Sequence, residues 1–380
     1  MKTTKLSELP ILPQEYDLEH YFKIQYPVAR DVGMSDSERR LVNGLIRYYQ
    51  PDCIIELGVS TGAGTLNILN AISDQNSKLV SIDILEELDD RMFHRVGERA
   101  LREFSDHPRW RLFTGVDASE IIEGLDIKFD FAVIDTAHLH PVESLNFLTL
   151  LPWLNDGAIV VVHDISDFWD QPDNIAPLHL FSTVCAEKII AGGDDWHSFS
   201  NIGAFQITQD TRKYIRNVFD ALMFKWNAFP FRDIANVFKL LNKYYSNENM
   251  MLFRKAFIAN IGLTYTSLDT LKQLPEDTIF YGAGRNMKGF LSIYEILDIP
   301  FNFKIWDVDA EKISAINGYN VSQPDFITFA QNHQLILITI SDSIIQSTIE
   351  RTFRMLNYRA FAIIPPDLSP IKYFDLLLSQ

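Results

Sequence analysis

The stretch that decides the fold is Ile54-Ile55-Glu56-Leu57-Gly58-Val59-Ser60-Thr61-Gly62-Ala63-Gly64-Thr65. Its first residues form a short apolar run with β-branched side chains, which predicts a buried parallel strand. Glycines follow at positions 58, 62 and 64, and an apolar pattern with helical spacing comes after them. A strand, a glycine turn and a helix are how α/β proteins bring backbone N–H groups and a helix N-terminus to a ligand. The stretch therefore predicts a ligand-binding turn in an α/β fold.

Further apolar runs with strand character follow at regular intervals, and helical patterns lie between them. Their expected bounds are 78–83, 110–114, 129–135 and 158–162. Two more runs, at 196–200 and 203–208, are expected to close the sheet as a pair. Strands that alternate with helices predict a parallel, doubly wound sheet. We therefore expect the α/β class, with a first domain built on one large sheet.

The chain of 380 residues is long enough for two domains. We expect an N-terminal arm at 1–35, and then a helix capped by Ser35 and Glu38 that opens a first domain at 36–209. Residues 210–274 are rich in aromatic side chains with helical spacing, which predicts a helical linker packed on the first domain. A substrate lid or a dimer surface, and with it a homo-oligomer, is the alternative. A second, smaller Rossmann-like α/β domain is expected at 275–380.

Composition and charge narrow the function classes. The chain is 47% hydrophobic and 22% charged, which is ordinary for a globular protein. Its net charge of −16 argues against general nucleic-acid binding, because neutralising phosphates requires a basic surface. Two cysteines cannot make a disulfide framework or a cysteine metal site. The N-terminus lacks the apolar region of a signal peptide, and no run approaches about 18 apolar residues, so we expect a cytoplasmic protein with no membrane partner.

Polar residues are expected at the carboxyl ends of successive strands. Ligands of open α/β sheets bind outside those ends, at the point where the strand order reverses. Each carboxylate taken singly has a structural alternative, since it can cap the next helix or turn. For Asp117 that alternative is as strong as ligand contact. Several such residues after successive strands nevertheless favour a ligand site; they are Glu56, Asp83, Asp117, Asp135, His163 and Asp164.

With these motifs the chain resembles class I S-adenosylmethionine-dependent methyltransferases over roughly residues 36–208. The matching segments are 56–64, 80–83, 115–118, 129–138 and 156–164. The last two together resemble a bacterial O-methyltransferase branch that includes macrolide-sugar and cephalosporin-tailoring enzymes. The resemblance implies a Rossmann-like, seven-stranded sheet whose last strand is antiparallel.

The resemblance also implies S-adenosylmethionine as the cofactor. Its methionine part would lie along the glycine loop, with Glu56 near its amino group, while Asp83 would accept the ribose hydroxyls and Asp117 would meet the adenine amino group. A dinucleotide would require Gly-x-Gly-x-x-Gly, which the spacing of the three glycines fits poorly. The expected cofactor contacts are Glu56, Gly58, Ser60, Gly62, Gly64, Asp83 and Asp117.

Methyl transfer to a hydroxyl requires an aligned acceptor and a group that removes its proton. By resemblance to sugar O-methyltransferases, His138 is the expected general base. Asp135, three residues before it, is expected to be a catalytic residue as well. His163 and His140 are its rivals. An ordinary histidine in a surface loop is the alternative interpretation of His138.

In several relatives a Mg²⁺ ion sits beside this position. Asp135 and Asp164 match its ligands, because hard cations prefer carboxylate oxygen. His163 stands where some relatives have an acidic residue, which counts against the metal. The alternative is that the two carboxylates only orient the acceptor or cap helices.

A second glycine turn, Gly282-Ala283-Gly284, follows an expected strand at 278–281. It resembles the Rossmann-like domain found behind some sugar methyltransferases. The leading hypothesis is an enzyme that methylates a hydroxyl of a small sugar-containing or natural-product acceptor. One alternative is a nicotinamide-dependent or sugar-nucleotide-binding enzyme acting through the second turn. Another is a non-catalytic binding or assembly module.

Overall fold

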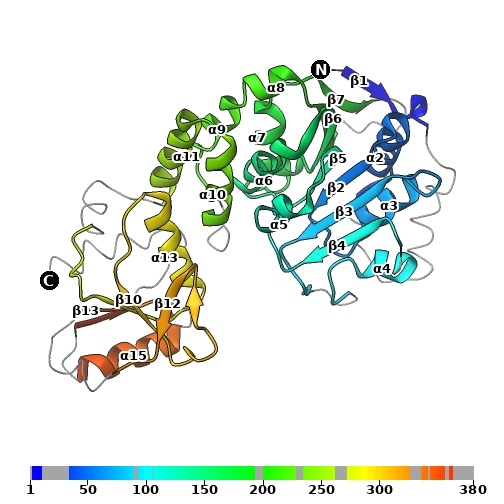
Figure 1. Ribbon diagram of the computed structural model, residues 1–380. Helices are drawn as coiled ribbons and strands as arrows, with labels where there is room; N and C mark the ends of the chain where they lie inside the picture. Colours follow the sequence, from blue (N-terminus) through cyan, green and yellow to red (C-terminus); the bar gives the residue numbers. More distant parts are fainter. Residues whose placement is uncertain are drawn as a thin grey trace. The chain divides into compact units, whose positions relative to one another are not determined.

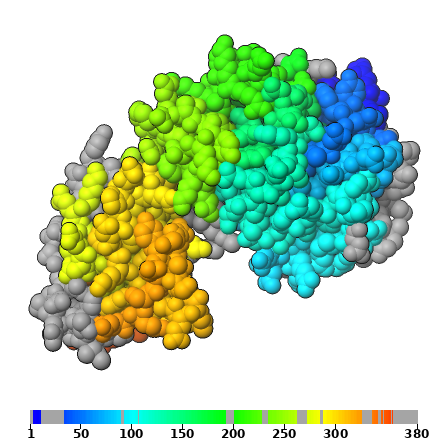
Figure 2. All heavy atoms as spheres, in the orientation of Figure 1, coloured from blue at the N-terminus to red at the C-terminus, as the bar shows by residue number. Residues whose placement is uncertain are grey.

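The computed structural model describes residues 2–10, 34–89, 93–105, 107–192, 200–227, 234–261, 272–325, 335–340, 343–355 and 359–362. The chain forms two compact units, residues 1–228 and 229–380 (Figure 1). The blue-to-green atoms of the first unit form one continuous body in Figure 2. The segment 210–274, expected as a linker, is thus divided between the two units.

The first unit is built on a mixed sheet of eight strands in the order β1-β7-β8-β6-β5-β2-β3-β4 (Figure 1). The central strand β2 pairs in parallel with both β3 and β5, so the strand order reverses beside it. The carboxyl ends of these strands meet at one edge, where a ligand of such a sheet binds. The strands are β1 (Lys2–Lys5), β2 (Cys53–Leu57), β3 (Lys78–Asp83), β4 (Trp110–Thr114), β5 (Phe129–Ile134), β6 (Leu154–His163), β7 (Lys188–Gly192) and β8 (Ile202–Gln206).

The α/β class and the antiparallel last strand are confirmed, since β8 runs antiparallel to both β6 and β7. The number of strands expected from the sequence, seven, was wrong. The sheet has eight strands rather than seven, because β1 of the N-terminal arm pairs in parallel with β7. The strand that pairs with β8 at the end of the sheet is Lys188–Gly192, whereas residues 196–199 of the strand expected at 196–200 lie outside the described part of the chain. Such pairings join distant segments, and the local pattern of a short run does not determine them.

Helices cover both faces of this sheet. On one side α2 contacts α3 and α3 contacts α4, while on the other α5 contacts α6 and α6 contacts α7. The cap expected at Ser35 is confirmed as a capping box with Glu38. No helix within the described ranges is long and apolar enough to cross a membrane. The helices are α2 (Asp36–Tyr49), α3 (Ala63–Ala71), α4 (Glu98–Phe104), α5 (Ala118–Leu125), α6 (Val142–Leu150), α7 (Ala176–Thr183), α8 (Gln209–Lys213) and α9 (Arg216–Ala221).

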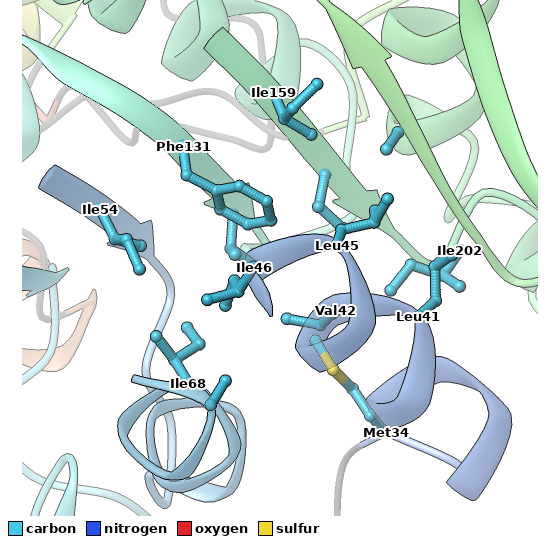
Figure 3. Close-up of a cluster of buried hydrophobic side chains, with 14 of the residues drawn as sticks. Met34, Leu41, Val42, Leu45, Ile46, Ile54, Ile68, Phe131, Ile159 and Ile202 are labelled. Carbon is cyan, nitrogen blue, oxygen red and sulfur yellow. The ribbon is translucent and has the colours of Figure 1, made fainter. Parts of the chain in front are cut away.

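The core on the α2 side holds this helix rigidly against the sheet. The apolar face of α2 points Leu41, Leu45 and Ile46 toward the sheet, where Phe131 and Ile159 lie (Figure 3). All five side chains are at most 2% exposed. Burying one large aliphatic side chain stabilises a fold by about 1.5–3 kcal/mol, so this face anchors α2 firmly. Glu38, in the first turn of α2, is thereby fixed relative to the strand ends.

The second unit contains a six-stranded sheet in the order β11-β12-β10-β9-β13-β14. Strands β12, β10, β9, β13 and β14 are parallel, and the order reverses between β9 and β13. The hairpin of β11 and β12 was not expected from the sequence. The elements are α10 (Ile234–Tyr244), α11 (Asn247–Asn260), β9 (Ile279–Tyr281), α13 (Arg285–Ile296), β10 (Lys304–Trp306), β11 (Ala315–Ile316), β12 (Tyr319–Ser322), β13 (Leu335–Ile338), α15 (Ser343–Met355) and β14 (Arg359–Ala362).

Candidate active site

The glycine loop between β2 and α3 makes the closest backbone approach in the site. Gly58 has a φ of +83°, and a Cβ added there would lie 1.7 Å from the carbonyl oxygen of Asp135. Only glycine fits, both because of its conformation and because the backbone of the next strand fills the space. Gly62, with a φ of +94°, then begins α3. Ser60 at the tip of the loop is exposed.

Asp83, at the end of β3, holds this loop in place. Its Oδ2 accepts hydrogen bonds from the backbone N–H groups of Val59 at 2.8 Å and Ser60 at 3.0 Å. Its Oδ1 accepts one from the N–H of Leu85 at 2.9 Å. Bonds from N–H groups to a carboxylate are stronger than those to a neutral acceptor, so Asp83 fixes the loop's conformation. Contact with a ribose stays a prediction.

Glu56 is buried within the fold beneath the loop. Its Oε2 accepts hydrogen bonds from the hydroxyls of Thr65 at 2.7 Å and Ser81 at 2.6 Å, and the residue is 2% exposed. Burial, together with the nearby charges of Asp135 and Asp83, raises the pKa of Glu56 to about 7, although the two hydroxyls oppose the shift. The carboxyl group thus ties β2 to α3 and β3. Its expected contact with a cofactor amino group stays a prediction.

Asp117 caps a helix. Its side chain accepts a hydrogen bond from the N–H of Ser119 at 2.8 Å, and the side chain of Glu120 accepts one from the N–H of Asp117 at 3.1 Å. This capping box begins α5. The structural alternative for Asp117 is therefore observed, and an adenine contact stays a prediction.

The histidines and carboxylates expected after β5 and β6 lie together at the carboxyl ends of these strands. His138 Nε2 lies 3.1 Å from Asp135 Oδ1 and 3.0 Å from Asp164 Oδ2. His163 Nδ1 lies 3.2 Å and 3.1 Å from the same two oxygens. Two carboxylates are therefore held between two imidazole rings. We call Asp135, His138, His163 and Asp164 the histidine–carboxylate cluster.

The cluster shifts the pKa values of its own members. Burial alone would lower the pKa of His138, but the hydrogen bond to Asp135 and the charge of Asp164 raise it above the usual 6.5. Burial likewise disfavours a charged His163, and the carboxylates of Asp135, Asp164 and Glu38 reverse this and raise its pKa well above 6.5. The pKa of Asp135 is lowered because the charge of His163 and the two histidine contacts outweigh its burial.

Two residues that the sequence did not single out as site residues support the cluster. Glu143 is fully buried and accepts hydrogen bonds from the backbone N–H of His138 at 2.6 Å and from the hydroxyl of Thr136 at 3.0 Å. It thereby holds His138, whose φ is +60°, in the left-handed region. Glu38 of α2 places its Oε2 3.4 Å from His163 Nε2. The capping motif marked Glu38 as a helix residue, but no local signal connects it to β6.

His140, the other rival base, lies apart from the cluster. Its Nδ1 lies 3.5 Å from His179 Nδ1, and its ring is fully buried. Burial and the neighbouring His179 lower the pKa of His140 to about 4. A buried, weakly basic ring is poorly suited to receive a proton from an acceptor.

The glycine loop and the cluster lie next to each other. Gly58 lies against the backbone of Asp135, and the N–H of Asp135 donates to the carbonyl of Leu57 at 3.0 Å. Residues 55–165 match the family model described as "Methyltransferase domain". This segment is a methyltransferase domain. The chain is accordingly a methyltransferase.

Solved structures show distant similarity to this chain. The O-methyltransferase TomG from Streptomyces achromogenes, involved in tomaymycin synthesis and solved with SAM, is 19% identical. The match covers 53% of this chain and 92% of that one, with a TM-score of 0.39. An O-methyltransferase from Bacillus cereus in complex with SAH is 15% identical over 52% of this chain and 93% of that one, with a TM-score of 0.38. No curated protein matches the chain.

The cluster fits a hard divalent cation poorly. Asp135, His138 and Asp164 each offer a ligand atom within 4.8 Å of the others. However, Asp135 Oδ1 and Asp164 Oδ2, the oxygens nearest His138, also lie 3.1–3.2 Å from His163 Nδ1. Mg²⁺ prefers oxygen ligands and water, and a positively charged imidazole at this distance would repel it.

Proposed function

We propose that this protein transfers a methyl group to a hydroxyl of a small acceptor, with His138 as the general base. The observation that carries the proposal is the direct packing of the glycine loop against Asp135, whose side chain is hydrogen-bonded to His138. A loop suited to the cofactor and a group suited to take a proton therefore adjoin. This is what alignment of a methyl donor with an acceptor requires.

His138 is suited to remove the acceptor's proton. When bound, S-adenosylmethionine supplies a methyl group on a positively charged sulfur, which the acceptor oxygen displaces. Asp135 and Asp164 both face Nε2 of His138, so they favour a hydrogen there and leave Nδ1 to receive the acceptor's proton. The same carboxylates stabilise the imidazolium that forms. Glu143 keeps the ring in position through the backbone of His138.

The cofactor would be held by the elements around the first glycine turn. Gly58, Ser60 and Gly62 all have a positive φ, and Ser60 at the tip of this turn is exposed. Asp83 and Asp117 lie at the ends of the next strands along the edge, where ribose and adenine contacts are expected. We propose this placement for residues 56–64, Asp83 and Asp117.

The acceptor class rests on the resemblance to macrolide-sugar and cephalosporin-tailoring enzymes, and we propose a sugar-containing or natural-product hydroxyl. The net charge of −16 supports a small-molecule partner over a nucleic acid. We also propose that the protein acts in the cytoplasm.

The proposal is tested by mixing the full chain with S-adenosylmethionine and a pool of glycosylated metabolites, and measuring S-adenosylhomocysteine. The cofactor alone should raise the melting temperature, and Asp83→Ala should abolish that rise. Cofactor binding without product from any acceptor pool would instead favour a non-catalytic binding module. A normal melting shift in Asp83→Ala would contradict the ribose assignment.

A second candidate function belongs to the second unit, which we infer to be a Rossmann-like domain that holds a nucleotide or sugar nucleotide. Its glycine turn lies where the strand order reverses, and Asp307 Oδ2 accepts a hydrogen bond from the N–H of Ala283 at 2.7 Å. Titrating NAD(H) or a nucleoside-diphosphate sugar against the full chain tests it. Saturable binding that Asp307→Ala removes would support it, and absence of binding would leave this domain a structural role.

A further inference from the structure

His163 is surrounded by carboxylates on both sides of its ring. Its Nδ1 lies 3.2 Å from Asp135 Oδ1 and 3.1 Å from Asp164 Oδ2, and its Nε2 lies 3.4 Å from Glu38 Oε2. The residue is 5% exposed, so water does not screen these charges well. Each of the three carboxylates comes from a different element, namely α2, the loop after β5 and the loop after β6.

This geometry determines the charge of the ring. A ring nitrogen that faces a carboxylate oxygen is stable only with a hydrogen on it, because a bare nitrogen and a carboxylate repel each other. Both nitrogens of His163 lie at ion-pair distance from carboxylates, so the surrounding negative charge favours the imidazolium form of the ring, although neither nitrogen makes a well-aligned hydrogen bond. A buried charge of this kind requires partners of opposite charge, and the surrounding groups provide them.

We infer that the positively charged ring of His163 takes the place of a divalent metal ion in this site. Asp135 and Asp164 are the carboxylates that would hold a metal, and Nδ1 of His163 instead lies 3.2 Å and 3.1 Å from their oxygens. His163 is therefore a positioning residue that acts through the two carboxylates on His138.

The inference rests on the proposed function only because that proposal assigns the cluster to the acceptor site. Whether the cluster binds a divalent cation does not depend on methyl transfer. A site with a fixed imidazolium should bind no divalent cation, whereas replacing His163 by a carboxylate should create a site of oxygen ligands.

The test is an electron paramagnetic resonance titration of the full chain with Mn²⁺, which stands in for Mg²⁺. The wild-type protein is expected to show no stoichiometric binding at about 100 µM Mn²⁺. His163→Glu is expected to bind one ion and to gain a saturable rise in melting temperature of about 5 °C or more with it. His94→Glu, which makes the same change of side chain at an exposed histidine of the same unit, should gain neither.

Stoichiometric Mn²⁺ binding by the wild type that Asp135→Asn removes would overturn the inference. So would a folded His163→Glu that binds no more Mn²⁺ than His94→Glu. If His163→Glu folds only with Mn²⁺ present, the inference is supported. If it does not fold at all, the wild-type titration alone decides. Failure to form S-adenosylhomocysteine would contradict the proposed function and leave the Mn²⁺ result unaffected.

Discussion

The two glycine turns use the same backbone arrangement but are bordered by different chemistry. In both, the first glycine donates to the carbonyl at the end of the neighbouring strand, from Gly58 to Ile82 at 3.0 Å and from Gly282 to Trp306 at 2.7 Å. In both, the acidic residue that follows that carbonyl accepts N–H groups of the turn, as Asp83 and Asp307 do. A strand, a glycine turn and an acidic anchor are thus shared.

The difference lies in the strand on the other side of each turn. After β5 the first turn meets Asp135 and the histidine–carboxylate cluster. After β13 the second turn meets Thr339, whose hydroxyl donates back to the carbonyls of Tyr281 at 3.1 Å and Gly282 at 2.5 Å. The glycine turn therefore creates a place for a ligand, and the neighbouring strand determines which chemistry can occur there.

The largest expected effect separates the two turns by their packing. Gly58→Ala would place a Cβ 1.7 Å from the carbonyl of Asp135, and we expect it to destabilise the first unit by about 4 kcal/mol or more. The matched change, Gly282→Ala, would place a Cβ 2.7 Å from Ile340 Cγ1 at a φ of +111°, and it should cost less, about 1–3 kcal/mol, because a side chain can move where a backbone carbonyl cannot. Urea unfolding followed by circular dichroism measures both. If the two variants lost equal amounts of stability, the first loop would have moved to accommodate the added Cβ.

The next largest effect is on the reaction rate, which should depend on the residues beside the first turn and not on those beside the second. His138→Asn should lower the rate of S-adenosylhomocysteine formation by about 10²–10⁴, because it removes the general base. Cofactor affinity should change little. The matched change beside the second turn, Thr339→Val, should leave the rate of the folded protein unaltered. A His138→Asn enzyme with normal turnover would remove His138 from the mechanism.

A smaller effect compares the two acidic anchors. Asp83→Asn weakens three charge-assisted hydrogen bonds and should cost about 2–3 kcal/mol of stability. Asp307→Asn weakens the two from Ala283 and Asp309 and should cost about 1–2 kcal/mol. Thermal unfolding measures both. A larger cost for Asp307 would indicate that the second turn depends more on its anchor than the first.

The smallest effect is a shift in pH dependence at the first turn. A protonated His138 cannot accept a proton, and its pKa is raised, so the rate should rise with pH through a midpoint above 6.5. Asp164→Asn removes one of the charges that raise this pKa and should move the midpoint to lower pH. A midpoint that Asp164→Asn leaves unchanged would mean that another group controls the rate.

Much of this site could be predicted from the sequence because its parts follow short-range rules. Apolar runs separated by helical patterns predict the parallel strands and their order along the chain. The carboxyl ends of parallel strands meet at one edge, so Asp135, His163 and Asp164 were expected near one another. The capping box at Ser35 was likewise visible, since it spans only four residues.

Only the tertiary structure decided what each polar group faces. Asp83 was expected to meet a ribose and is seen to fasten the loop, because its partners Val59 and Ser60 are 23–24 positions away in the chain. The pairing of Glu38 with His163 joins α2 to β6, and the pairing of β1 with β7 joins two strands; in both cases the partners lie more than a hundred residues apart in the chain. Local patterns specify which segments form helices and strands. The partners of a buried charge depend on long-range packing, and here that packing places His163 between three carboxylates.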